Sequence, residues 1–62
     1  MKIEVGQKFE AVNTQTIYTV INIAGSKVEI SGVNSKDSII HKDIIKLSDI
    51  KAMIGLSYWI KL

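Results

Sequence analysis

The sequence contains no cysteine, no proline and no arginine, and each absence narrows what the protein can be. Without cysteine there is no disulfide bond, no thiol nucleophile and no thiolate-bound metal. Without proline, nothing interrupts the pairing of β-strands. Without arginine, the chain lacks the planar group that reads guanine edges and binds phosphates through paired hydrogen bonds, which disfavours sequence-specific recognition of nucleic acid.

Long apolar runs are also missing. The longest have only three residues, at positions 52–54 and 58–60, whereas a membrane-spanning helix needs about 18. Residues 1–5 alternate between apolar and polar side chains and do not form the apolar stretch of a secretory signal. We therefore expect no membrane span and a cytoplasmic location.

The chain has 62 residues, of which 47% are hydrophobic, and a net charge of +2. This length allows a single domain, residues 1–62, and the hydrophobic fraction is too high for a disordered chain. A domain of this size buries only about 60% of the surface of its unfolded chain, so we expect a thin core and modest stability. There is no room for both an uninterrupted core and a deep ligand pocket, which needs about 300 Å³ or more.

The first half of the sequence predicts β-strands, since its β-branched residues favour them and alternate with polar residues. Within the longest strand the alternation breaks, because Tyr18 and Val20 share one face while Ile23 falls on the other. A β-bulge near residues 21–22 would return Ile23 to the inner face. Alternatively, both faces of this strand are covered. The predicted strands are residues 8–12, 16–24 and 27–31.

A tight turn is expected between the second and third strands. The dipeptide Gly25-Ser26 is typical of a type II′ hairpin, which needs glycine at its first central position. Val28 and Ile30 of the third strand would then face the core. We expect Gly32 to end or kink this strand and residues 34–38 to form a loop.

The second half is ambiguous. Residues 38–47 alternate as a strand would, yet the apolar residues between 40 and 54 also recur at helical spacing. We favour a short helix over residues 48–54, with a possible start as early as Asp43. Residues 57–62 then form a closing strand.

The helix boundaries rest on three residues. Ser48 can cap the first turn with its hydroxyl group, and Asp49 would lie in that turn, where a negative charge favours the helix dipole. Gly55 can supply the left-handed residue that ends many helices, with Leu56 folding back on the last turn.

A family resemblance rests on four groups of residues: Tyr18-x-Val20-x-x-Ile23, Val28-x-Ile30, Ile50-x-x-Met53-Ile54 and Trp59-Ile60. Over residues 7–62 the chain resembles the SH3-like small barrel and is similar to small proteins of unknown function that phages and mobile elements carry. The resemblance implies a mainly β fold, an SH3-like small barrel of about five antiparallel strands with one short helix before the last strand. It implies no catalytic residue.

Catalysis and metal binding have little support in the sequence. His41 is the only histidine, and its nearest carboxylate is Asp43, which would share its face of an extended strand. The six carboxylates are scattered, and the glycines form no phosphate-binding motif. We expect a protein that is not an enzyme and that has no cofactor and no metal site.

The aromatic residues suggest binding instead. Adjacent strand residues point to opposite faces, so we expect Trp59 in the core and Tyr58 outside. Tyr58, with Tyr18 if their strands are neighbours, would form an exposed platform. The rim loop between residues 34 and 42 adds three polar binding candidates: Lys36, His41 and Lys42.

These features favour a small non-enzymatic binding module with a protein partner, contacted through a barrel face or the rim loop. The alternative is a low-specificity nucleic-acid-binding barrel, with a modest basic stripe formed by Lys36, Lys42, Lys46 and Lys51. The chain would be a monomer or a weak homodimer, because much apolar surface must stay exposed at this size.

Overall fold

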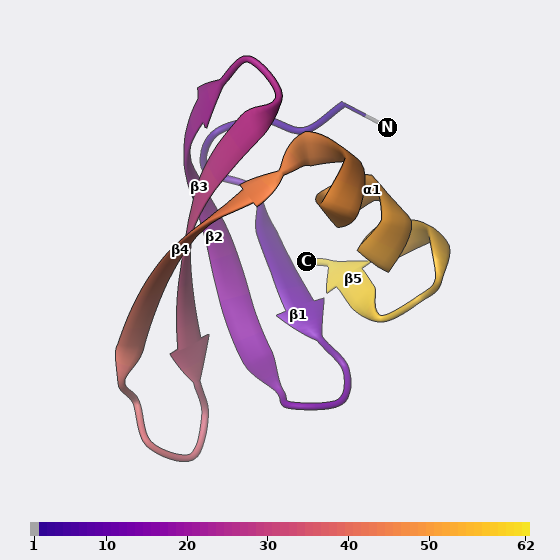
Figure 1. The fold of residues 1–62 in the computed structure, drawn as a ribbon. Coiled ribbons are helices and arrows are strands. Elements are labelled where there is room, and N and C mark those ends of the chain that lie inside the picture. Colours follow the sequence, from indigo (N-terminus) through magenta and orange to yellow (C-terminus); the bar gives the residue numbers. More distant parts are fainter. Residues whose placement is uncertain (1) are drawn as a thin grey trace.

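The computed structural model describes residues 2–62 and contains five strands and one helix. The strands form one antiparallel sheet with the order β4-β3-β2-β1-β5 (Figure 1). The prediction of a mainly β fold with five antiparallel strands and a short helix before the last strand is confirmed. The elements are β1 (Lys8–Ala11), β2 (Thr16–Ala24), β3 (Lys27–Asn34), β4 (Ile40–Lys46), α1 (Leu47–Gly55) and β5 (Trp59–Lys61).

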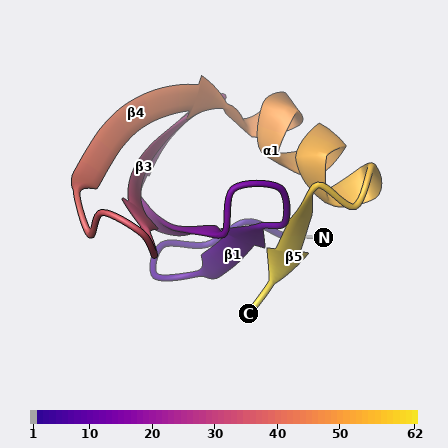
Figure 2. The same cartoon turned by 90° about the horizontal axis from the view of Figure 1, so that it is seen from below.

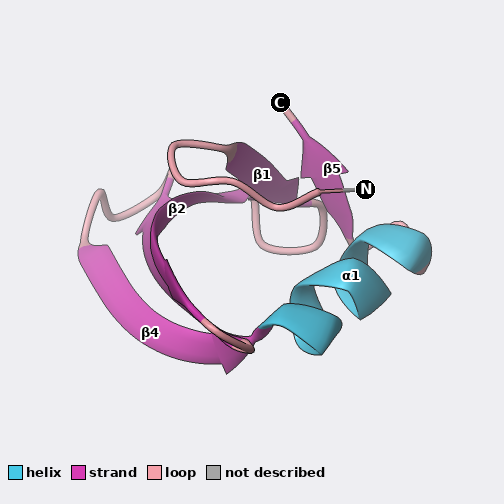
Figure 3. Ribbon diagram, turned by 90° about the horizontal axis from the view of Figure 1, so that it is seen from above, coloured by secondary structure: helices cyan, strands magenta, loops and turns pink. Residues whose placement is uncertain are grey.

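The sheet curls strongly but does not close. Strands β4 and β5 are its two edges and do not pair with each other. Helix α1 lies across the opening between them and packs against both (Figures 2 and 3). The molecule is therefore a barrel-like sheet in which a helix takes the place of the missing strand contact.

The long strand β2 contains the predicted bulge. Its register with β3 shifts between Val20 and Asn22, so that Ile21 is the extra residue. Val20 is buried on the inner face and Ile23 packs against the core beyond the bulge. The bulge restores the inward pattern and bends the strand, as a small curled sheet requires.

The β2–β3 hairpin also matches its prediction. Gly25 has φ +62° and is the one of the two turn residues with positive φ, which is the pattern of a type II′ turn. Ala24 pairs with Lys27 on either side of it. Val28 and Ile30 are buried, as expected.

The core lies on the concave face of the sheet, under α1. Phe9, Val20, Val28 and Ile50 are its most deeply buried side chains, and Ile50 is the one buried residue of the helix. Trp59 is in the core, as predicted, with 8% of its surface exposed. The other buried apolar residues are Ile3, Ala11 and Ile30.

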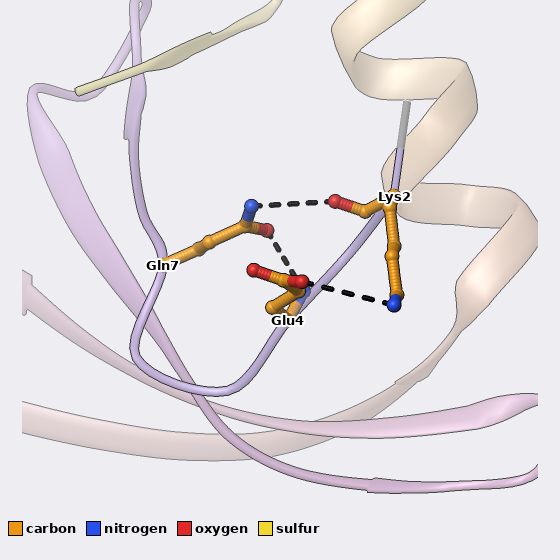
Figure 4. Close-up of polar contacts among 3 residues, drawn as sticks. All are labelled: Lys2, Glu4 and Gln7. Carbon is orange, nitrogen blue, oxygen red and sulfur yellow. Dashed lines mark hydrogen bonds and ion pairs between the residues drawn. The ribbon is translucent and has the colours of Figure 1, made fainter.

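Burial of Ile3 was not foreseen, and a local hydrogen-bond network explains it. The side chain of Gln7 turns back on the N-terminal segment (Figure 4). Its Oε1 accepts a bond from the Glu4 N–H (2.9 Å), and its Nε2 donates to the Lys2 carbonyl (3.3 Å). Lys2 and Glu4 also form an exposed ion pair at 3.9 Å. These bonds hold the segment in a tight turn from which Ile3 enters the core.

The structure resolves the ambiguous region in favour of strand followed by helix. Lys46 is the N-cap of α1, with extended backbone angles and no capping side chain. The Leu47 N–H donates to the Ser26 carbonyl at 2.7 Å, so the chain leaves β4 still bonded to its neighbour. The predicted cap at Ser48 is therefore wrong, because the strand runs directly into the helix. Asp49 does lie in the first turn.

The C-terminus of α1 differs from its prediction as well. Gly55 is the last helical residue rather than the left-handed one, and Leu56 is exposed. Ser57 has φ +63°, its N–H donates to the Ile54 carbonyl (3.0 Å), and the Tyr58 N–H donates to the Met53 carbonyl (2.9 Å). This is a Schellman motif in which serine occupies the position that glycine usually fills.

The Gly55→Ala variant is expected to be more stable than the wild type by about 0.5–1 kcal/mol, because glycine in a helix costs that much relative to alanine. A Cβ at Gly55 would meet nothing within 4 Å. Ser57→Gly should also raise the free energy of unfolding by removing a side chain from a left-handed residue. Urea denaturation followed by Trp59 fluorescence measures both changes. A less stable Gly55→Ala variant would instead place the left-handed residue at Gly55.

Candidate binding groove

A groove of about 300 Å³ lies between the concave face of the sheet and α1. The sheet is open on the side that α1 covers, because its edge strands β4 and β5 do not pair. The buried core includes Ile50 and Trp59 and leaves the groove beside them unfilled. Its volume is at the lower end for ligand pockets, and most of its wall is apolar. The lining residues come from five elements: Tyr18, Ile30, Asp43, Ile45, Asp49, Ala52, Met53 and Trp59.

Two stacked aromatic rings form one wall of the groove. The ring centroids of Tyr18 and Trp59 are 4.7 Å apart and their planes differ by 18°. Strand β1 separates β2 from β5, but its residue beside Trp59 is the small Ala11, which leaves room for the rings to meet above it. Phe9 supports Trp59 from the core side at a centroid distance of 6.0 Å.

Gly32 sets the position of the Tyr18 ring. The two residues are cross-strand partners, and a Cβ at Gly32 would lie 2.6 Å from Cε1 of Tyr18. The ring therefore lies directly over the glycine backbone. Gly32 does not end the strand, since β3 continues to Asn34, and the glycine serves a close approach.

The Gly32→Ala variant is expected to lose about 1–3 kcal/mol of stability, the usual cost of forcing atoms into an occupied site. The added methyl group displaces the Tyr18 ring from Trp59, so the near-UV circular dichroism of the aromatic side chains should weaken. Gly55→Ala is the matched control, because the same substitution meets open space there. Wild-type stability with an unchanged near-UV spectrum would show that Tyr18 does not lie over Gly32.

Two carboxylates lie at the groove. Asp43 comes from β4, and its Oδ1 accepts a hydrogen bond from the Ile44 N–H at 2.8 Å, which fixes the group on the edge of the sheet. Asp49 comes from the first turn of α1. The only ion pair within residues 2–62 is Lys2–Glu4, so neither carboxylate forms an ion pair with a lysine of the described chain.

The two predicted tyrosines line one depression, although β1 lies between β2 and β5. Tyr18 is half-buried in the groove, and Tyr58 is 50% exposed just before β5. Both line a smaller depression of about 210 Å³ that shares Met53 and Trp59 with the groove. The platform is thus continuous with the groove through Trp59.

The structure does not bring the three polar candidates together. Lys36 lies in the loop between β3 and β4, beside a polar hollow that also involves the β1–β2 turn. His41 and Lys42 belong to β4 and not to the predicted loop. As consecutive strand residues they point to opposite faces, and His41 shares its face with Asp43.

The convex face carries a second exposed surface, which we call the apolar row. Ile40, Val33 and Ile17 are successive cross-strand partners, and Ile60 continues the line beyond Glu10. The four apolar side chains are 38–63% exposed. The register places four lysines on the same face of the sheet: Lys8, Lys27, Lys42 and Lys46.

Of the eight groove residues, only Tyr18 was a binding candidate from the sequence; Ile30 and Trp59 were expected in the core, and the others were given no binding role: Asp43, Ile45, Asp49, Ala52 and Met53. Asp43 was considered as a neighbour of His41 and as an early start of the helix, and Asp49 as a residue of the first helical turn. The available signal was the alternation of Asp43 with Ile45, which puts the carboxylate on an inward face. The packing of α1 over this face is a tertiary arrangement that the local sequence pattern does not indicate.

No protein-family model, curated protein or solved structure matches the chain. Within the described residues, no three His, Asp or Glu side chains are close enough together to hold a metal ion. From residue 2 to residue 62 there is also no helix with the length and apolar character needed to cross a membrane.

Proposed function

We propose that the protein is a non-enzymatic binding module that holds a segment of a partner protein in the groove. The observation that carries the proposal is the stacked pair of Tyr18 and Trp59, which presents an apolar wall at the opening between α1 and the sheet. Rigid aromatic residues set in a pocket are the usual energetic anchors of protein interfaces.

The other groove residues support the same use. Met53 is 37% exposed on α1, and methionine adapts its flexible side chain to a partner surface. The groove is large enough for one or two side chains. The curled sheet supplies a rigid wall and α1 supplies the opposite wall, so the site is largely formed before a partner arrives.

A pull-down from the source organism tests the proposal with a matched pair of variants. Ala52→Arg puts a long side chain into the groove from an exposed helix position, whereas Ala24→Arg makes the same change at the exposed end of β2. Both variants gain one positive charge. The partner should be retained by the wild type and by Ala24→Arg and lost from Ala52→Arg. Equal retention by both variants would contradict binding at the groove.

A second candidate function is low-specificity binding of nucleic acid on the convex face, which the four lysines on that face favour. The stacked aromatic residues lie on the opposite face, away from these lysines. A mobility-shift titration of single and double strands tests this function. Binding that falls steeply with salt and is lost in Lys42→Glu would support it, because phosphate contacts release counterions. No shift at about 100 μM protein in low salt would exclude it.

A further inference from the structure

We propose that the groove accepts a basic side chain, lysine or arginine, from the partner protein. This inference rests on the proposed function and specifies the chemistry of the partner at the same site. Two features of the groove favour this side chain: a largely apolar wall, against which a hydrocarbon stem can pack, and two carboxylates that form no ion pair within residues 2–62.

The apolar wall suits the stem of a basic residue. Lysine and arginine lay their methylene groups along apolar surfaces while their charged ends reach polar groups. Tyr18 and Trp59 supply apolar ring surface at the groove, and the methylene stem can pack against it. Met53 completes the wall from α1.

The carboxylates select the charge. Asp43 and Asp49 come from different elements, so their charges are brought together only by the packing of α1 beside β4. Asp43 uses Oδ1 to accept the Ile44 N–H, and a carboxylate has further lone pairs to accept from a ligand. The two carboxylates therefore favour a cationic side chain in the groove over an acidic one.

Titration with short peptides tests the inference, with Trp59 fluorescence as the readout because it is the only tryptophan. The probes are blocked pentapeptides, Ser-Val-X-Val-Ser, in which X is lysine, arginine or norleucine. Norleucine keeps the hydrocarbon stem of lysine and lacks its charge. The lysine and arginine peptides should bind about fivefold more tightly than the norleucine peptide at low salt, with the difference shrinking at high salt.

Two variants assign this difference to the groove. Asp43→Asn keeps an oxygen for the Ile44 N–H and removes the charge, so it should weaken the lysine peptide about threefold and leave the norleucine peptide unchanged. Asp37→Asn is the matched control, since its Oδ1 accepts the Ile39 N–H at 2.9 Å in the β3–β4 loop, outside the groove. This control should bind all three peptides as the wild type does.

The possible failures are distinguishable. Equal binding of the norleucine and lysine peptides would overturn the basic chemistry and leave the groove as a binding site. No response of Trp59 to any peptide would overturn both the inference and the proposed function. A response of Trp59 to protein concentration alone would overturn the inference by making a second copy of the chain the occupant.

Discussion

Trp59→Ala should unfold the protein or leave it with a melting transition far below that of the wild type. Truncation of a buried tryptophan costs about 3–5 kcal/mol, which is a large part of the stability of a domain this small. Trp59 is 8% exposed and contacts both Phe9 and Tyr18 through its ring. Thermal denaturation followed by far-UV circular dichroism measures the loss without depending on the removed fluorophore.

Trp59→Phe is the matched variant, because it keeps an aromatic ring in the same position. It should retain a cooperative transition between those of the wild type and Trp59→Ala. A Trp59→Ala protein that melts near the wild-type temperature would contradict the placement of Trp59 in the core and with it the wall of the groove.

Ile50→Ala should have the second large effect, a loss of about 2–5 kcal/mol in the free energy of unfolding. Ile50 has no exposed surface and is the one buried residue of α1, so its side chain holds the helix against the sheet. Urea denaturation measures the loss. The helical wall of the groove should become less ordered at the same time, because α1 positions three of the lining residues: Asp49, Ala52 and Met53.

The control is Ile44→Ala, the same substitution at a position that is 63% exposed on the convex face. Its stability should stay within about 0.5 kcal/mol of the wild type. Equal losses in the two variants would mean that α1 is not docked through Ile50.

The strands of the first half were predictable because their signals are local. Glycine before serine selects a two-residue turn, and the broken alternation around Ile21 can be repaired by one extra residue, which is what the structure contains. The second half carried two overlapping periodicities. The structure uses both in turn, with the strand period up to Lys46 and the helical period after it.

The structure differs from the expectations for Ser48 and Gly32 because contacts with residues distant in sequence overrode the local preference of each residue. Ser48 does not cap α1 because the strand enters the helix directly and the Leu47 N–H is already bonded to Ser26. Gly32 does not end β3 because its missing side chain makes space for Tyr18. Ser26 is distant in sequence from Leu47, and Tyr18 is distant from Gly32. The sequence therefore showed that these positions were unusual, but it did not show which contacts they make.

The groove was the least predictable part of the molecule. Its walls come from β2, β3, β4, α1 and β5, and it forms only because the sheet stays open along the helix. Tyr18 was identified as a binding residue from its type. Asp43 and Asp49 were not, because their role depends on a tertiary arrangement that places two separate carboxylates beside one aromatic pair.

The most direct test of the proposed site is to determine where the lysine side chain of a bound peptide lies on the protein. Nuclear Overhauser effects between the methylene protons of the peptide lysine and an isotope-labelled protein give this contact in solution. We expect cross-peaks to the ring protons of Trp59 and to the methyl group of Met53. Cross-peaks confined to the apolar row, to Ile17, Val33, Ile40 and Ile60, would place the binding surface on the convex face and contradict the account.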